Sequence, residues 1–298
     1  MYCQESFLKN NYLNTFIENV QSPKRIALSS RYPYLKTPII EFRRFNNNLK
    51  NFFNIYLARS KQKNYFDNKI FSHQSVLMRK LGDSDIRLQK QKITNLKIAA
   101  SKLDKIIIKP GQTFSFWHLV GRPSAKRGFV NGMLLSNGKV VEGLGGGLCQ
   151  MANLLYWMFL HAPVEIKQRY HHSLDVFPDS GRTLPFGSGA TVLYNFVDLK
   201  IKNISPDTLQ LKIWLTDNHL KGQLLSDKKI ESKFHIYEKK HCFIEREGKY
   251  YRFNEIWREE KVQGEIINNQ KIIENFAPVL YEVNDNYLKE NNYKLIRL

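Results

Sequence analysis

Cys149 follows three glycines and opens an apolar helical pattern in the string GLGGGLCQMANLLYW, residues 143–157. A thiol in the first turn of a helix lies at the positive end of the backbone dipole, which favours the reactive thiolate. Gly145, Gly146 and Gly147 can take unusual backbone angles and let a ligand approach closely. The string therefore predicts that Cys149 is a nucleophile. The alternative is a small buried residue beside a tight turn, because free cysteines are commonly buried.

A histidine that could act with this thiol occurs in RYHHSLDVF, residues 169–177. In an extended strand His172 shares one face with Leu174 and Val176, and His171 lies on the other face. The first face is otherwise apolar, which predicts that His172 points inward, toward the helix of Cys149. In a Cys–His pair the imidazole takes the thiol proton and returns it to the leaving group. The alternative is a core histidine whose hydrogen bonds are satisfied inside the protein.

Other side chains could complete such a site. The group that orients the histidine could be Asp198, Asn153 or Gln150. Gln150 could also donate to an oxyanion, together with backbone N–H groups of the helix start. Trp117 and Tyr156 could form a platform for a sugar or a peptide, or could belong to the core.

The helix that carries Cys149 has one continuous apolar face. Its members recur at helical spacing and are Leu148, Met151, Ala152, Leu155, Met158, Phe159 and Ala162. Leu154, Trp157 and Leu160 cover much of the remaining surface. The pattern predicts a helix over 148–162 that is buried nearly all round.

Strand patterns dominate the sequence after residue 105. Pro110-Gly111 indicates a turn, and Asn137-Gly138 and Glu247-Gly248 indicate hairpins. Further strands are expected at 171–177, 190–196, 198–203 and 209–217. The sequence predicts an α+β fold, in which N-terminal helices precede a mainly antiparallel β-sheet core with one buried helix. Its expected parts are a basic helical region (1–70), a core domain (71–227) and a small β-rich extension (228–298).

The positive charge is concentrated near the N-terminus. The formal net charge is +19, and residues 1–100 hold 18 Lys and Arg against 6 Asp and Glu. In the same region a helix carries Phe42, Phe45, Leu49, Phe52, Phe53 and Tyr56 at helical spacing. Such a helix can lie on an anionic membrane surface or pack on a neighbouring domain. We expect no nucleic-acid partner, because no nucleic-acid-binding module is recognisable.

Several classes of protein are excluded by what the sequence lacks. No apolar run is long enough to cross a bilayer, and MYCQESFLKN lacks the features of a secretory signal. We expect a protein of the cytoplasm or of the inner face of the membrane. Three widely spaced cysteines argue against a disulfide framework. No metal or cofactor is expected: His161, His171 and His172 lack the usual ligand spacing, and GLGGG lacks a nucleotide fingerprint.

Successive motifs resemble those of the VanW family, especially the form found beside B-type vancomycin-resistance genes. They are PGQTFSFWHLVG, GGGLCQMANLLYWMFLHAP, RYHHSLDVFP, GATV, DLKIKN, YRFNEIWRE and NFAPVLY. The resemblance runs from about residue 72 to residue 281 and implies a connection with peptidoglycan. It assigns the family histidine to His172, three residues after Arg169. It also implies an acidic residue before ATV, where this chain has Gly189.

Three classes of function remain open at this stage. The first is cell-wall chemistry by Cys149 and His172 on a peptide-like substrate. The second is glycan cleavage, with Glu142 or Asp175 as the proton donor. The third is non-catalytic binding of peptidoglycan or its precursors. In each case the expected substrate contacts are Gly145, Gly146, Gly147, Gln150, Asn153, Arg169 and Trp117.

Overall fold

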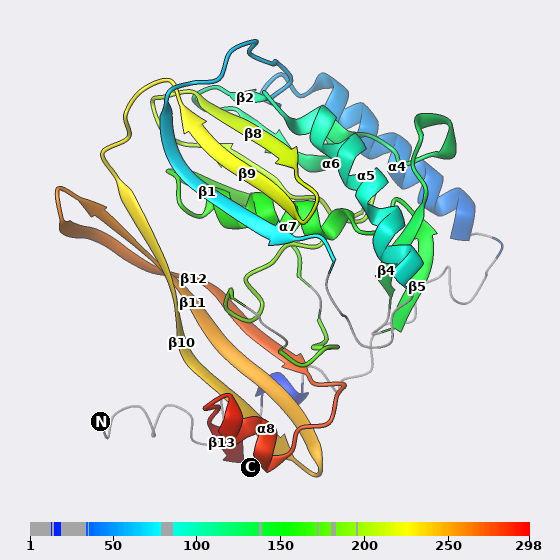
Figure 1. The fold of residues 1–298 in the computed structure, drawn as a ribbon, viewed down its shortest axis with the longest axis vertical. Coiled ribbons are helices and arrows are strands. Elements are labelled where there is room, and N and C mark those ends of the chain that lie inside the picture. Colours follow the sequence, from blue (N-terminus) through cyan, green and yellow to red (C-terminus); the bar gives the residue numbers. More distant parts are fainter. Residues whose placement is uncertain are drawn as a thin grey trace.

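The computed structural model describes residues 13, 15–18, 34, 36–78, 86–136, 139–171, 173–179, 183–194 and 196–298. The helices described over their full length are α4 (Lys36–Phe53), α5 (Ile86–Leu103), α6 (Phe116–Val120), α7 (Leu148–Phe159) and α8 (Asp285–Glu290), with a 3-10 turn at Ala125–Arg127. Residues 13 and 15–18 are also helical. The predicted α+β fold is confirmed, since N-terminal helices precede sheets that are mainly antiparallel (Figure 1).

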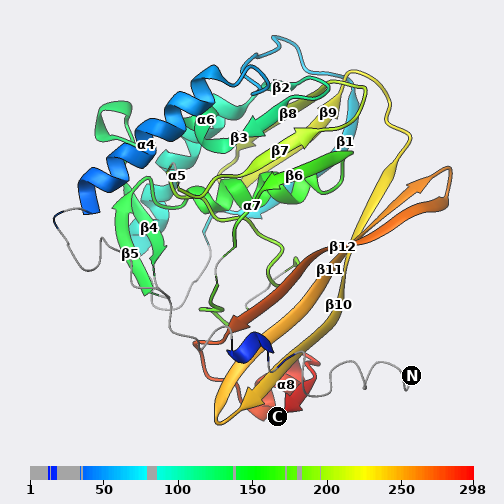
Figure 2. The same cartoon turned by 180° about the vertical axis from the view of Figure 1, so that it is seen from behind.

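Two sheets enclose the main core. The first has the order β1-β9-β8-β2 and consists of β1 (Asn68–Val76), β2 (Ile107–Ile108), β8 (Leu209–Leu215) and β9 (His219–Ser226). The second has the order β3-β7-β6 and consists of β3 (Thr113–Ser115), β6 (Val164–Gln168) and β7 (Lys200–Asn203). Helix α7 lies between them, beside α5 (Figures 1 and 2).

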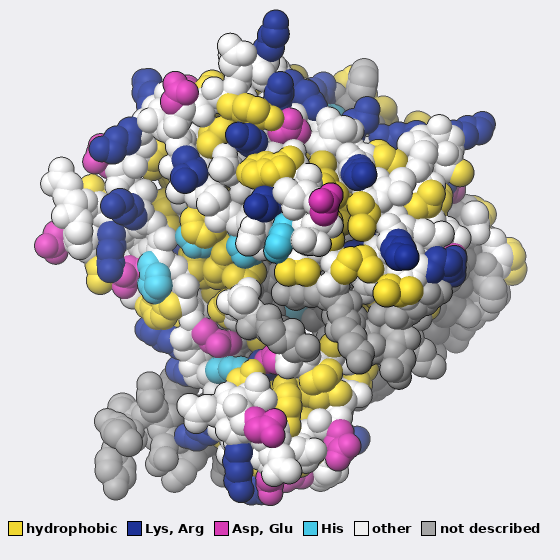
Figure 3. Space-filling view, in the orientation of Figure 1, with side chains coloured by type: hydrophobic (Ala, Val, Ile, Leu, Met, Phe, Trp, Pro, Cys, Tyr) yellow, Lys and Arg dark blue, Asp and Glu magenta, His cyan; other side chains and the backbone are white. Residues whose placement is uncertain are grey.

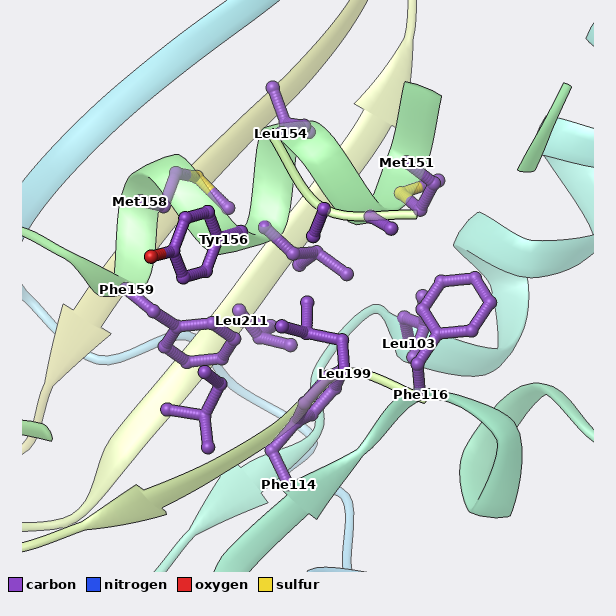
Figure 4. Close-up of a cluster of buried hydrophobic side chains, with 14 of the residues drawn as sticks. Leu103, Phe114, Phe116, Met151, Leu154, Tyr156, Met158, Phe159, Leu199 and Leu211 are labelled. Carbon is purple, nitrogen blue, oxygen red and sulfur yellow. The ribbon is translucent and has the colours of Figure 1, made fainter. Parts of the chain in front are cut away.

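The apolar pattern of α7 explains this central position. From α7 the side chain of Phe159 points toward Phe114 and Leu199 of the core (Figure 4), and the ring centroids of Phe159 and Phe114 are 5.2 Å apart. Nine of the twelve α7 residues are buried. The helix ends at Phe159, three residues before the expected end, and the chain turns there into β6. The helix is thus buried on nearly all sides, as predicted. Cys149 in its first turn is only partly buried and lies at the edge of the main core.

A small hairpin covers the N-terminal end of α7. Strands β4 (Asn131–Ser136) and β5 (Lys139–Leu144) pair as the Asn-Gly signal predicts, and the turn residues 137 and 138 lie outside the described residues. Gly146 lies in the turn after β5, against the backbone of Gly132 in β4. The hairpin thus fixes the glycine turn from which α7 begins.

The C-terminal sheet has the order β12-β11-β10-β13. It is built from the long strands β10 (Lys233–Arg246), β11 (Lys249–Val262) and β12 (Glu265–Pro278), with the short parallel strand β13 (Leu295–Arg297) at its edge. The predicted hairpin is confirmed: Arg246 pairs with Lys249, and Glu247 and Gly248 have φ angles of 54° and 73°. These positive values suit the two-residue turn that joins twisted strands.

Two predicted strands are wrong. The described residues of 171–177 and 190–196 form isolated bridges, Asp175 with Val279 and Leu193 with Val197, and no regular strand. Side chains anchor both segments instead: Arg252 donates to Asp175, and Asn153 accepts from the backbone N–H of Ala190. Because 171–177 is not a regular strand, its alternating pattern does not determine which of its side chains point inward.

Helix α4 forms within the region where a Phe-rich helix was predicted, and four of its described apolar side chains are largely exposed. Phe42, Phe45, Leu49 and Phe53 are 66%, 62%, 45% and 70% exposed. Among the described residues, none of the helices is long and apolar enough to span a membrane.

Candidate functional site

The glycine turn before α7 is held by contacts with α5 and with the β4–β5 hairpin. Asn95 in α5 is fully buried and donates to the carbonyls of Gly146, at 2.9 Å, and Val130, at 3.0 Å. Gly147 caps α7 with a φ of 93°, a left-handed conformation that favours glycine. The turn is thus a rigid support for the first turn of the helix.

The structure gives these glycines a packing role. A Cβ atom at Gly146 would lie 2.1 Å from the carbonyl carbon of Gly132, and one at Gly147 would lie 2.4 Å from Cβ of Lys92. A Cβ atom at Gly145 would lie 2.8 Å from Cβ of Pro123. Because protein atoms fill the space beside all three, close packing accounts for the glycines that the sequence assigned to ligand approach.

Helix α7 reaches the surface at one polar edge. Its three residues that are not buried are Cys149, Gln150 and Asn153, all within the first two turns. Cys149 and Asn153 are four residues apart and therefore share one side of the helix. The structure brings together a thiol and two amide side chains on a helix that is otherwise closed to solvent.

The thiol of Cys149 contacts the segment that carries the GATV motif. Its Sγ atom lies 3.2 Å from Oγ1 of Thr191 and 3.8 Å from the carbonyl oxygen of Val192. The backbone N–H of Thr191 donates in turn to the carbonyl of Tyr170, at 2.8 Å. Through Thr191 the chain around Arg169 and Tyr170 thus lies beside the Cys149 motif.

Asn153 and Arg169 fix the same segment along α7. Oδ1 of Asn153 accepts a hydrogen bond from the backbone N–H of Ala190, at 2.7 Å. Arg169 donates from Nε and Nη2 to the carbonyl of Gly189, and its guanidinium lies 5.2 Å from the ring centroid of Tyr156. Burial lowers the pKa of Arg169, and the charge of Tyr156 opposes that effect. Both residues therefore hold the segment that contacts the thiol.

Gln150 is engaged elsewhere. Its Nε2 atom donates to Oγ of Ser75 and to the carbonyl of Val76, both at 2.8 Å. These bonds tie the start of α7 to the end of β1. In this arrangement the side chain of Gln150 positions the helix, and its backbone N–H donates to the carbonyl of Gly147 at 3.0 Å. The N–H groups of Leu148 and Cys149 are then the candidate donors for an oxyanion.

The predicted base, His172, lies outside the described residues. Its neighbour His171 is half-buried, with Nδ1 3.4 Å from Nη1 of Arg169. The pairing of Cys149 with His172 therefore stays a prediction.

Asp198 and Trp117 occupy a different place in the fold. Asp198 is buried and accepts hydrogen bonds from Oγ of Ser115, at 2.6 Å, and from the backbone N–H groups of Trp117 and Leu199. Burial raises the pKa of Asp198, while these hydrogen bonds act in the opposite direction. Trp117 is 4% exposed, and its indole donates to the carbonyl of Val197. Together they fix the start of α6 within the core.

The two carboxylates considered for glycan cleavage both have basic partners. Asp175 is 4% exposed and forms an ion pair with Arg252 of β11, at 3.2 Å. Glu142 of β5 forms an exposed ion pair with Arg87 of α5, at 2.7 Å. A proton donor for glycan cleavage needs a raised pKa, whereas a cationic partner favours the ionised form. The described residues include no cluster of three or more potential metal-binding His, Cys, Asp or Glu side chains.

A cleft of about 370 Å³ lies between the end of α7 and the C-terminal sheet. Tyr156, Arg169 and His171 line one side, and Ile273 and Glu274 of β12 line the other. The sequence hypothesis did not predict that Thr191 contacts Cys149 or that Glu274 lines this cleft. Thr191 lies in the quoted GATV motif, but no spacing rule links Glu274 to Arg169, about a hundred positions away.

Comparisons with known proteins agree with the motifs. The family model described as VanW like protein matches residues 91–225. The chain is 35% identical over 199 residues to the vancomycin B-type resistance protein VanW of Enterococcus faecalis, covering 66% of this chain and 72% of that protein. It is 31% identical over 114 residues to the uncharacterized protein YoaR of Bacillus subtilis, covering 38% of this chain and 36% of that protein. No solved structure matches the chain. The extent of the first alignment, together with the family match around Cys149, shows that this chain belongs to the VanW family.

Proposed function

We propose that this protein acts in peptidoglycan metabolism or glycopeptide resistance, and that Cys149 is its reactive group on a peptide-like substrate related to peptidoglycan. The biological part of the proposal is supported by the similarity to a vancomycin resistance protein. The chemical part is supported by one observation: α7 is buried except at the edge that carries Cys149, Gln150 and Asn153.

The proposed chemistry follows from the place of the thiol. A Cys149 thiolate attacks the carbonyl carbon of an amide, and the N–H groups of the first helical turn donate to the oxyanion. The amine leaves with a proton, and water then hydrolyses the thioester. His172 is the proposed carrier of the proton from the thiol to the amine. Thr191, whose hydroxyl oxygen lies 3.2 Å from Sγ, is proposed to orient the thiol.

Glycan cleavage is less favoured than thiol chemistry. Asp175 is enclosed with Arg252, which stabilises its ionised form, and Glu142 has Arg87 beside it. Non-catalytic binding is the second candidate, and the cleft beside Arg169 and Glu274 is the observation that favours it.

The first experiment tests whether the thiol is accessible. In a Cys3→Ser background the protein keeps Cys149, which is half-buried, and Cys242, which is 1% exposed. Burial raises the pKa of Cys242 to about 12, which further suppresses its thiolate. Alkylation followed by peptide mass analysis should modify Cys149 much faster than Cys242. Equal slow labelling of both thiols in the folded protein would contradict a reactive Cys149.

The second experiment separates reactivity from packing. Cys149→Ser should abolish function in a resistance or wall-composition assay while lowering the free energy of unfolding by less than about 1 kcal/mol, because solvent and Thr191 can satisfy the hydroxyl. Cys242→Ser is the matched control. It buries a hydroxyl and should cost about 1–3 kcal/mol without selective loss of function. A Cys149→Ser variant that unfolds more easily but keeps full function would show that the thiol is structural and would favour the binding role.

A further inference from the structure

Helix α4 presents its apolar side to solvent. Phe42, Phe45, Leu49 and Phe53 are spaced three or four residues apart, so they form a continuous stripe along one side of the helix. Beyond the end of α4 the stripe is followed by Ile55 and Tyr56, which are 79% and 66% exposed. Amphipathic helices of globular domains normally turn this side toward the core. Here the orientation is reversed.

Polar contacts hold the opposite side of α4 to the rest of the protein. Glu41 accepts hydrogen bonds from both terminal nitrogens of Arg122, each at 3.1 Å. The guanidinium of Arg44 lies 5.5 Å from the ring centroid of Tyr194, and Arg59 donates to the carbonyl of Asn51 at 2.9 Å. The outward stripe is therefore a consequence of how the helix is fastened, and α4 is a fixed part of the domain surface.

Basic side chains flank the stripe. Arg43 and Lys50 are exposed on the same edge of α4, and Glu41, the one acidic residue in the α4 sequence, is paired with Arg44 and Arg122. An open cleft of about 650 Å³ follows this edge and is lined by Ile39, Phe42, Arg43, Asn46, Lys50 and Phe196, among others. Lys and Arg side chains are also spread over the part of the surface formed by α5 and the β1-β9-β8 strands (Figure 3). The two exposed cations Arg43 and Lys50 at the edge of the stripe thus favour an anionic partner.

We propose that α4 docks this protein on an anionic lipid bilayer. The aromatic stripe would enter the boundary between headgroups and acyl chains, while Arg43 and Lys50 would contact lipid phosphates. A lipid surface fits a long, exposed apolar stripe with a basic edge, because it needs no pocket of matching shape. Docking through α4 does not depend on any chemistry at Cys149.

The test measures co-sedimentation of the full chain with vesicles of phosphatidylcholine alone or mixed with phosphatidylglycerol. Truncation is unsuitable because Leu57 and Ala58, just after α4, are 2% and 0% exposed. The apolar test variant is Phe42→Ser with Phe45→Ser, and its control is Ile266→Ser with Ile267→Ser, which are 55% and 59% exposed on β12. The charge variant is Arg43→Glu with Lys50→Glu, and its control is Lys228→Glu with Lys229→Glu, also exposed.

The wild type should co-sediment with the anionic vesicles and should not co-sediment with the neutral ones. Both α4 variants should lose at least about tenfold in partition coefficient, and both controls should stay within about twofold of the wild type. Binding should weaken at about 1 M salt, where the Debye length is about 3 Å. Unchanged binding by either α4 variant, or equal binding to neutral vesicles, would overturn the proposal. The proposal would also be overturned if the wild type did not bind vesicles but formed a dimer, and if Phe42→Ser with Phe45→Ser dissociated that dimer.

Discussion

Arg252 and Asp175 form an enclosed ion pair that joins the C-terminal sheet to the segment after the family histidine. Nη1 of Arg252 lies 3.2 Å from Oδ2 of Asp175, and the two side chains are 1% and 4% exposed. Nη2 of the same guanidinium binds Asp179 at 2.5 Å, and Nε donates to Nε2 of His241 at 2.8 Å. Burial opposes the charge of Arg252, but the hydrogen bond to Asp179 and the charges of both aspartates outweigh it and raise the pKa of Arg252.

Arg252→Met should destabilise the protein severely. The substitution leaves Asp175 and Asp179 almost buried without their cation, and breaking a buried ion pair from one side costs about 3–5 kcal/mol. Urea unfolding at neutral pH measures the loss. Arg246→Met is the control, since Arg246 is 30% exposed and pairs with an exposed Glu247, so it should cost less than about 1 kcal/mol. Similar unfolding free energies for the two variants would mean that the enclosed pair does not hold the segment in place.

Local patterns predicted the elements that the chain builds from neighbours in sequence. The apolar repeat from Leu148 to Phe159 indicated α7, and Glu247-Gly248 indicated the β10–β11 hairpin. Both depend on periods and turn residues that act within a few positions. The same pattern predicted a helix buried nearly all round, and the structure adds a polar edge at Cys149, Gln150 and Asn153.

Long-range pairing could not be predicted from one sequence. The segment 171–177 alternates like a strand, yet the buried guanidinium of Arg252, 77 residues after Asp175, fixes it. The period of α4 was equally clear, but it did not reveal which side would face solvent. That orientation depends on Glu41 meeting Arg122 across the fold, a contact between residues 81 positions apart. Partners of this kind become visible only when the chain is folded.

Gly146→Ala should destabilise the protein far more than Gly143→Ala. The new Cβ atom at position 146 would lie 2.1 Å and 2.3 Å from the carbonyl carbon and oxygen of Gly132, so backbone must move. At position 143 the Cβ atom would meet Cδ1 of Leu134 at 2.5 Å, and that side chain can change its rotamer. We expect a loss of about 2–3 kcal/mol or more for Gly146→Ala and about 1 kcal/mol or less for Gly143→Ala. Thermal melts of both variants measure this difference. Equal melting temperatures would contradict the close approach of Gly146 to Gly132.

The stability of the protein should fall in mild acid because of His161. Its ring stacks on Phe71 with centroids 3.6 Å apart, and Nδ1 donates to the carbonyl of Trp157 at 2.9 Å. Burial lowers the pKa of His161 to about 4, although the hydrogen bond to Trp157 opposes this. In the unfolded chain the pKa of this histidine is about 6.5. Between about pH 4 and about pH 6.5 the imidazole is therefore protonated in the unfolded state and mostly neutral in the folded state.

The stabilisation from neutral His161 is therefore present above about pH 6.5 and is lost as the pH falls toward about 4, with a slope of at most about 1.4 kcal/mol per pH unit. Urea unfolding across this range should show a flatter profile for His161→Gln, whose amide can still donate to Trp157. Parallel profiles for wild type and variant would assign the acid sensitivity to other groups.

Gly189 and Asn153 should be energetically coupled. A Cβ atom at Gly189 would lie 2.5 Å from Oδ1 of Asn153, the oxygen that accepts the hydrogen bond of the Ala190 N–H. Gly189→Ala should push the amide aside and cost about 1 kcal/mol, and Gly189→Asp should do the same while adding the carboxylate implied by the family resemblance. Asn153→Ala removes the obstructing amide, so it should cost less in the Gly189→Ala background than alone. A double-mutant cycle should give a coupling of about 0.5–1 kcal/mol, whereas additive losses would mean that the amide does not fill the space beside Gly189.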